Sequence, residues 1–336
     1  MRLLVTGGAG FIGSNFIQYM LRHYPGYEII NADVLTYAGN VDNLLDVEHH
    51  PNYRFIHADI TRSDDMEPLF QEKIDVVVNF AAESHVDRSI ADPGIFVRTN
   101  VMGTQVLLDS SLKYGVSKYV QISTDEVYGS LGESGFFTEE TPLAPNSPYS
   151  ASKAGADMLV RAYHETFGLP VNITRCSNNY GPFQFPEKLI PLMISNALEE
   201  KPLPVYGDGL HVRDWLYVED HCSAIDRVIH QGRNGEVYNI GGNNEFTNLQ
   251  IVTTLLQQLG KPDSLVTFVA DRLGHDRRYA IDSSKIQNEL GWKPRYSFVE
   301  GIQHTIQWYV NNQAWLQRIR TGPTEHNYTR CRGKGP

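Results

Sequence analysis

The chain has 336 residues, of which 41% are hydrophobic, and it carries a formal net charge of −10. This length and apolar content suit an ordinary globular protein with one large α/β domain and a smaller second one. The net negative charge repels polyanions, so nucleic acids and anionic membrane surfaces are not expected as partners.

The first half of the chain alternates short apolar runs with longer amphipathic ones, which is typical of βαβ units around a parallel sheet. Strands are predicted at residues 3–6, 28–32, 53–57, 75–81, 118–123 and 171–175. Helices are predicted to begin near Gly10, Ser63, Asp92 and Tyr149, and the third continues to about Tyr114. The predicted fold class is therefore α/β, with a Rossmann-like doubly wound parallel sheet.

Prolines become frequent between residues 182 and 204, and we interpret this change as a domain boundary after about residue 178. A strand at 212–218 and a helix at 219–230 are predicted to rejoin the first sheet, so the C-terminal substrate domain is smaller and partly discontinuous. The predicted division is a dinucleotide-binding Rossmann domain over 1–178, joined by 212–230, a substrate domain over 179–322 and a disordered tail over 323–336.

Three glycines predict a phosphate-binding loop. Gly7, Gly10 and Gly13 follow the first predicted strand at the GxxGxxG spacing, where glycines permit a tight turn and let backbone amides approach a pyrophosphate. Asp33 lies 20 residues beyond Gly13 at the end of the second predicted strand, where a carboxylate binds ribose hydroxyls and repels a 2′-phosphate. NAD is therefore the expected cofactor, rather than NADP. The alternative is a structural glycine turn with a loop aspartate.

Two acids, Asp125 and Glu126, follow directly on the fifth predicted strand. Successive strand residues point to opposite faces, so both carboxylates reach one ligand only where the strand ends, which is where ligands sit in open α/β sheets. Two carboxylates in one site raise one pKa by mutual repulsion and supply a protonated acid beside an ionised base, as an elimination of water requires. The alternative is a solvated acidic turn or a helix cap.

Tyr149 and Lys153 have the Tyr-x-x-x-Lys spacing, which places both side chains on one face of a predicted helix. A cation about 4 Å from a phenol stabilises the phenolate by about 4 kcal/mol at an effective dielectric near 20. That is enough to lower a tyrosine pKa from about 10 to about 7. We therefore expect Lys153, assisted by an oxidised nicotinamide, to prepare Tyr149 to deprotonate a sugar hydroxyl. The alternative is an ordinary pair on a helix surface.

Over nearly the whole chain these motifs resemble the extended short-chain dehydrogenase/reductase family. Gly7 to Gly13, Thr124, and Tyr149 with Lys153 carry this broad resemblance. Four longer segments look like those of the dTDP-glucose 4,6-dehydratases, namely AAESHVDRS at 81–89, STDEVYG at 123–129, SNNYGP at 177–182 and RDWLYV at 213–218.

The resemblance implies a catalytic set and a reaction. The implied catalytic residues are Thr124, Asp125, Glu126, Tyr149 and Lys153, with Asp125 as the acid and Glu126 as the base. The implied activity is that of an NAD-dependent hydro-lyase, which oxidises C4 of the sugar, eliminates water across C5 and C6 and returns the hydride to C6. The product would be a 4-keto-6-deoxy sugar nucleotide, as in deoxysugar biosynthesis of the dTDP-rhamnose type.

The resemblance also assigns ligand contacts. Position after predicted strands places 59–60 and 80–84 at the cofactor cleft, unless these segments are plain turns. Beyond the glycines, the implied cofactor residues are Phe11, Ile12, Asp33, Val34, Leu35, Thr36, Asp59, Ile60, Phe80, Ala81, Ala82, Glu83, Ser84, Thr99 and Asn179. The implied substrate residues are Ser84, Thr124, Asn178, Lys188, Leu189, Pro204, Val205, Tyr206, Arg213, Asn248, Asp271, Arg272, Leu273, Gly274 and His275. The cations among them, Lys188, Arg213 and Arg272, can pair with a diphosphate or form internal salt bridges.

Three kinds of function stay open at this point: a nucleotide-sugar 4,6-dehydratase, a UDP-sugar 4-epimerase and a non-catalytic dinucleotide-sensing or scaffold protein. The acid pair argues against the epimerase, and the tyrosine–lysine pair argues against the scaffold. Thymidine and uridine differ by one methyl group, worth about 1–3 kcal/mol, so the preferred base stays open. The helices near Asp92 and Tyr149 are expected to form the four-helix seam of a homodimer, as the resemblance implies.

Other motifs give no sign of a different chemistry. The three cysteines form no CxxC pair, which fits a reducing cytoplasm. No apolar stretch approaches the roughly 20 residues of a membrane span, and Met1 to Thr6 runs into the glycine loop instead of a signal sequence. The 12 histidines form no HExxH pattern, so no metal site is expected.

Overall fold

The structure is a computed structural model that describes residues 1–271 and 275–321. Our expectations for Arg272, Leu273, Gly274 and the tail at 323–336 therefore concern residues outside the described part. None of the described helices combines the length and the apolar composition that a membrane crossing requires.

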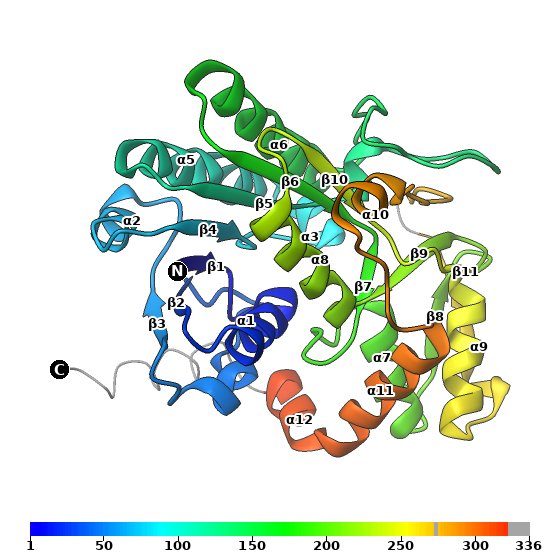
Figure 1. The fold of residues 1–336 in the computed structure, drawn as a ribbon. Helices are drawn as coiled ribbons and strands as arrows, with labels where there is room; N and C mark the ends of the chain where they lie inside the picture. Colours follow the sequence, from blue (N-terminus) through cyan, green and yellow to red (C-terminus); the bar gives the residue numbers. More distant parts are fainter. Residues whose placement is uncertain (272–274, 322–336) are drawn as a thin grey trace.

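A seven-stranded parallel sheet forms the centre of the larger part of the molecule (Figure 1). The strands are β1 Arg2–Thr6, β2 Glu28–Asp33, β3 Tyr53–His57, β4 Val76–Asn79, β5 Lys118–Thr124, β6 Val171–Cys176 and β10 Val237–Ile240. They lie in the order β10-β6-β5-β4-β1-β2-β3. The order 3-2-1-4-5-6 of the first six strands is that of dinucleotide-binding Rossmann folds. The predicted fold class is confirmed.

Helices cover both faces of this sheet because alternate strand residues are apolar on opposite sides. Leu3 and Val5 of β1 pack in one core with α1 and α8, whereas Leu4 packs in another with α2, α5 and α6. The bounds are α1 Phe11–His23, α2 Ser63–Phe70, α5 Gly103–Tyr114, α6 Pro148–Phe167 and α8 Val218–Gln231. The helix expected to begin near Asp92 is built from α4 Pro93–Phe96, the π-helical segment η2 Val97–Met102 and α5.

A smaller part follows, built on a third apolar core. It contains a three-stranded sheet of β7 Asn178–Tyr180, β9 Val212–Tyr217 and β11 Glu245–Thr247, and a two-stranded sheet of β8 Leu203–Tyr206 and β12 Val266–Val269. Its helices α7 Leu189–Leu198, α9 Asn248–Leu259, α11 Phe298–Asn311 and α12 Gln313–Thr321 surround them (Figure 1). The remaining described helices are η1 Val41–Val47, α3 Val86–Ala91, η3 Asp125–Tyr128, η4 Asp263–Leu265 and α10 Ser284–Leu290.

The prediction that a strand at 212–218 rejoins the main sheet is wrong. The segment forms β9, which pairs with β7 and β11 in the small sheet. The following helix α8 does return to the larger part and packs against α1. The strand that joins the main sheet is β10, parallel to β6. Both strands flank α8 and both are largely buried, so apolar pattern alone did not distinguish them.

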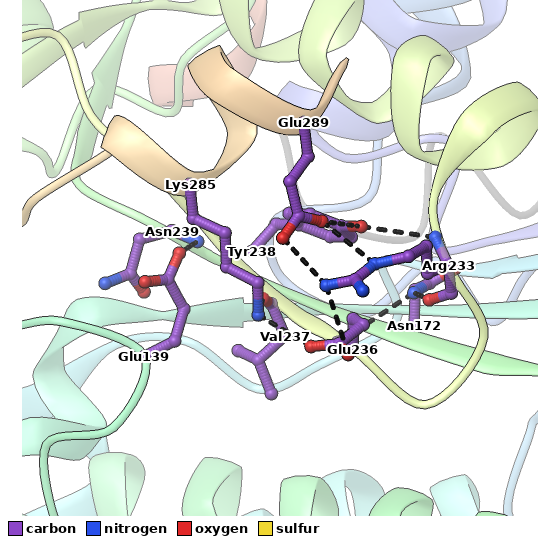
Figure 2. A network of polar contacts seen from close by, with 9 residues as sticks. All are labelled: Glu139, Asn172, Arg233, Glu236, Val237, Tyr238, Asn239, Lys285 and Glu289. Carbon is purple, nitrogen blue, oxygen red and sulfur yellow. Dashed lines mark hydrogen bonds and ion pairs between the residues drawn. The ribbon is translucent and has the colours of Figure 1, made fainter.

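A polar network covers the outer edge of β10 and ends the sheet there (Figure 2). The backbone N–H of Asn239 donates to Glu139 Oε1 at 2.8 Å, and the Lys285 ammonium donates to the Val237 carbonyl at 2.8 Å. Unpaired backbone groups at a strand edge attract further strands, and side chains satisfy them here instead.

Candidate active site

A cavity of about 490 Å³ lies at the carboxyl ends of the main-sheet strands, where open α/β sheets bind their ligands. The predicted cofactor residues that line it are Gly7, Gly10, Phe11, Ile12, Gly13, Asp33, Val34, Thr36, Asp59, Ile60, Phe80, Ala81, Ala82, Glu83, Ser84, Thr99 and Asn179. Leu35 does not line it. Its side chain is buried, its φ is 54°, and its backbone N–H donates to Asp33 Oδ1 at 2.8 Å.

At Gly7, Gly10 and Gly13, glycine is favoured for a different steric reason in each case. Gly7 has a φ of +69°, and a Cβ there would lie 2.5 Å from the backbone nitrogen of Ala81. A Cβ at Gly13 would lie 2.5 Å from the Gly7 carbonyl oxygen. Among the described residues, a Cβ at Gly10 would meet the Gly7 carbonyl oxygen alone, at 3.3 Å. Gly10 is also the N-cap of α1 and offers no side-chain cap, so the helix amides there are open to a pyrophosphate.

The Asp33 carboxylate is fixed by two backbone amides. Ala9 N–H donates to Oδ2 at 2.9 Å and Leu35 N–H donates to Oδ1 at 2.8 Å. Burial raises the pKa of Asp33, and these two hydrogen bonds oppose the shift. Each carboxylate oxygen keeps a further lone pair, which suits it to accept from ribose hydroxyls. The loop and this carboxylate therefore fit a dinucleotide.

The acid pair leaves the end of β5 in a 3₁₀ turn, η3. Thr124 is the last strand residue, and its hydroxyl oxygen accepts from the Glu126 N–H at 3.2 Å, which caps the turn. The same hydroxyl donates to Asp125 Oδ1 at 3.3 Å. Because the alternation of the strand ends here, both Asp125 and Glu126 line the cavity.

The Asp125 carboxyl is deeply buried and lies near two other carboxylates. Its side chain is 1% exposed, and its pKa is raised well above the ordinary value. Burial is the largest cause, and the carboxylates of Glu126 and Asp214 add to it by repulsion, while the Arg213 cation opposes it. These effects favour the protonated form of Asp125, the form from which a general acid acts.

Tyr149 and Lys153 lie on α6 and both line the same cavity. The Lys153 ammonium donates to the Ile122 carbonyl at 2.6 Å. The expectation that Lys153 and an oxidised nicotinamide together lower the phenol pKa stays a prediction. The pKa of Tyr149 is raised well above its usual value, because the ring is buried and the Glu126 carboxylate opposes a phenolate.

Two of the predicted phosphate-binding cations hold protein carbonyls as well. Arg213 is 5% exposed, and its guanidinium donates to the Asp276 carbonyl at 2.8 Å and lies 4.3 Å from the centre of the Tyr279 ring. The Lys188 ammonium donates to the Ser84 carbonyl at 3.2 Å and lines the large cavity.

A second cavity of about 40 Å³ adjoins the first, because Glu126 and Asn178 line both. Arg213 and His275 also line it. The predicted substrate residues Ser84, Thr124, Asn178 and Lys188 line the large cavity. The predicted substrate residues that line neither are Leu189, Pro204, Val205, Tyr206, Asn248 and Asp271.

Two of the predicted substrate residues that line neither cavity, Tyr206 and Asp271, lie beside His275, which lines the small cavity. The rings of Tyr206 and His275 are 6.4 Å apart, and Asp271 Oδ1 lies 2.7 Å from His275 Nδ1. The imidazoles of His211 and His275 stack at 3.6 Å. His211, Asp271 and His275 bring three possible ligand atoms within 4.8 Å of one another, so the expected absence of a metal site stays a prediction.

The cavity residues that sequence reasoning missed include Tyr37, Phe185 and Glu187. Tyr37 and Phe185 come from segments distant in the chain, and their rings meet edge to face at 5.8 Å. The Arg88 guanidinium lies 3.8 Å from the centre of the Tyr37 ring. Tyr37, Phe185 and Glu187 belong to none of the spaced motifs described above. The run of aromatic and charged residues around Lys188 was the one available signal.

Known proteins are similar to this chain along nearly its whole length. Residues 4–305 match the family described as GDP-mannose 4,6 dehydratase. The dTDP-glucose 4,6-dehydratase of Xanthomonas campestris pv. campestris (strain B100) is 53% identical over 338 residues, covering 95% of this chain and 96% of that protein. Two crystal structures of dTDP-glucose 4,6-dehydratases with NAD bound are also similar. The one from Bacillus anthracis str. Ames is 57% identical, with a TM-score of 0.90 and 95% of this chain and 99% of that chain covered. DesIV from Streptomyces venezuelae is 53% identical, with a TM-score of 0.92 and 95% and 100% covered.

The glycine loop yields a paired prediction. Gly10→Ala should leave the fold intact but weaken NAD binding about 10–100-fold, since a methyl group blocks an amide that gives a charge-assisted hydrogen bond. Gly13→Ala should instead lower the free energy of unfolding by about 1–3 kcal/mol, because backbone must move to admit the Cβ. Calorimetric NAD titration and denaturant unfolding separate the two effects. Equal NAD affinity in wild type and Gly10→Ala would contradict the assignment of this loop.

Proposed function

The chain belongs to the GDP-mannose 4,6 dehydratase family, and from its similarity to dTDP-glucose 4,6-dehydratases we propose that it converts dTDP-glucose to dTDP-4-keto-6-deoxyglucose and water with bound NAD. The observation that carries this proposal is the buried Asp125 carboxyl, with its raised pKa, next to Glu126 in the cavity of Tyr149. A redox step alone needs a tyrosine and a lysine. The added acid and base are what an elimination requires.

The residues that hold NAD are those of the glycine loop and Asp33. The open amides at the start of α1 receive the pyrophosphate, and Asp33 accepts from the adenosine ribose. When bound, NAD would supply a reversible hydride carrier, which accepts hydride from C4 and donates it to C6, and its oxidised form would supply a positive charge.

The first half of the reaction rests on Tyr149, Thr124 and Lys153. Tyr149 accepts the proton of the C4 hydroxyl, and Thr124 holds that oxygen with its hydroxyl. The raised phenol pKa in the protein by itself means that Tyr149 enters as a neutral phenol, so cations must assemble beside it before it acts as a base. The Lys153 ammonium is one such cation, held in place by its bond to the Ile122 carbonyl.

The second half rests on the acid pair. Oxidation at C4 acidifies the C5 proton, because the ketone stabilises the carbanion, and Glu126 removes it. Asp125 then gives its proton to the departing C6 hydroxyl, which leaves as water. The order matches the environments, since burial favours the protonated form of Asp125 and Glu126 lies at the junction of the two cavities.

The nucleotide diphosphate is assigned to the side of the small cavity. Arg213 and His275 line it, and Lys188 lines the adjoining part of the large cavity. A buried arginine is suited to a diphosphate because its guanidinium stays charged at every accessible pH.

The proposal includes a homodimer formed through the helical layer of η2, α5 and α6. Val97 is 51% exposed and Met102 is 54% exposed on η2, and Met158 is 47% exposed on the neighbouring α6. Large exposed apolar side chains that gather on adjacent helices favour a protein contact. A second copy with the same helices would close them into a four-helix seam.

The acid pair is tested by the double substitution Asp125→Asn with Glu126→Gln. Release of alkali-sensitive ketosugar from dTDP-glucose should fall at least about 100-fold, because both proton transfers lose their group. Bound NAD, measured after denaturation, should stay at the wild-type level. The matched control is Glu199→Gln with Glu200→Gln, another adjacent acid pair, which forms surface ion pairs with Lys201 and Lys261.

Product release at the wild-type rate from the double variant would refute the assigned roles. Parallel assays with UDP-glucose and GDP-mannose identify the nucleotide. Conversion of UDP-glucose to its 4-epimer without any ketosugar would favour the epimerase instead.

The dimer is tested by Met102→Glu combined with Met158→Glu. Two charges in an apolar seam should convert a dimer into a monomer in light scattering, since each would be buried without a partner. The control is Phe268→Glu, a side chain on β12 that is 56% exposed. A wild-type protein that is monomeric at micromolar concentration would rule the seam out.

A further inference from the structure

One fully buried acid, Asp157, has no part in the reaction as derived. It lies on α6, one helical turn after Lys153, and its side chain is 0% exposed. Arg175 on β6 donates from Nε to Asp157 Oδ2 at 2.9 Å. Residues four apart on a helix share one face, with their Cβ atoms about 5–6 Å apart, so the carboxylate and the Lys153 side chain are neighbours.

The same arginine reaches the segment of the acid pair. Its Nη1 donates to the Tyr128 hydroxyl at 3.0 Å, and its guanidinium lies 4.9 Å from the centre of the Tyr128 ring. Tyr128 is the last residue of η3, the turn that begins with Asp125. The Tyr128 hydroxyl donates in turn to Asn239 on β10 at 2.8 Å, a residue drawn in Figure 2. Asp157 and Arg175 thus join the lysine helix to the acid-pair turn.

Lys153 is a buried cation, and few groups support its charge. Burial lowers its pKa, and Asp157 is the strongest influence in the opposite direction. Burial raises the pKa of the Cys176 thiol to about 12, so this neighbour on β6 is neutral. The other titratable or charged groups around this end of the cavity are Tyr149 on α6, Asp125 and Glu126 on η3, Arg98 on η2 and Arg175 behind Asp157.

We propose that Asp157 is a positioning residue that keeps Lys153 charged and, through Arg175, holds the lysine helix at a fixed distance from the acid pair. This inference rests on the proposed function, because it concerns the cation that assists Tyr149. A buried ammonium without a counter-charge sheds its proton, since neutralisation costs less than leaving the charge in an apolar medium. The Asp157 carboxylate supplies that counter-charge. Burial raises the pKa of Asp157 itself, and the cations of Arg175 and Lys153 oppose this shift.

The test is the pH profile of kcat for Asp157→Asn, a substitution of equal size. Activity needs protonated Lys153 and is lost as the pH rises through the lysine pKa. Removing the carboxylate lowers that pKa, so the loss should begin about one to two pH units lower, the effect of one unit charge about 6 Å away at an effective dielectric near 20. At the acidic end of the profile, kcat should approach that of wild type. A residue that only supported the fold would lower kcat equally at every pH.

The matched control is Asp226→Asn, which makes the same change in net charge on α8, where the carboxylate binds Tyr24 and His230 away from the cavity. Its profile should coincide with wild type. If Asp157→Asn does not fold, Asp157→Leu with Arg175→Met removes both buried charges together, which folds tolerate far better than one unpaired charge. That variant should show a smaller shift in the same direction, because the Arg175 cation behind Asp157 is lost as well.

An unshifted alkaline limb in the folded variant overturns the inference. This outcome differs from failure of the proposed function, in which the wild-type protein itself would release no ketosugar from dTDP-glucose.

Discussion

Desolvation of the Asp125 carboxyl is the constraint on which the account of the site depends. Moving a carboxylate out of water costs several kcal/mol, and the cost rises further beside Glu126 and Asp214. Both effects favour the protonated form of the group. Because its folded pKa lies above its unfolded value, the stability it contributes is present at low pH and lost as the pH rises through the folded pKa. The fold accepts this cost, and the proposed function uses the buried carboxyl as its acid.

The backbone makes that burial possible at one place. The chain stops alternating at Thr124 and turns as η3, so two consecutive acids face one cavity at the carboxyl end of β5. The same edge of the sheet carries the glycine loop, and α6 brings Tyr149 alongside. The proposed oxidation and elimination can share one sugar because the acid pair and Tyr149 both come from the connection between β5 and β6, and the glycine loop follows β1 of the same parallel sheet.

Local patterns predicted most of this arrangement. Strand alternation, the glycine spacing and the Tyr-x-x-x-Lys spacing are properties of short segments, and each was found where the sequence placed it. Contacts between residues far apart in the chain could not be predicted from such local patterns. The main sheet pairs with β10 and not with β9 because β10 is the strand that forms backbone hydrogen bonds with β6. The Asp157–Arg175 pair joins residues that are 18 apart in the chain and lie on two different elements. The raised pKa of Tyr149 in the protein by itself was not accessible from the sequence either, because it follows from burial, and burial is decided by the whole fold.

The protonation state of Asp125 can be observed directly by infrared difference spectroscopy between the wild-type protein and Asp125→Asn at neutral pH. The account predicts that the wild-type spectrum contains the carbonyl stretch of a neutral carboxylic acid that the variant lacks. A difference confined to carboxylate bands would show that Asp125 is ionised, and the assignment of this residue as the acid would then be wrong.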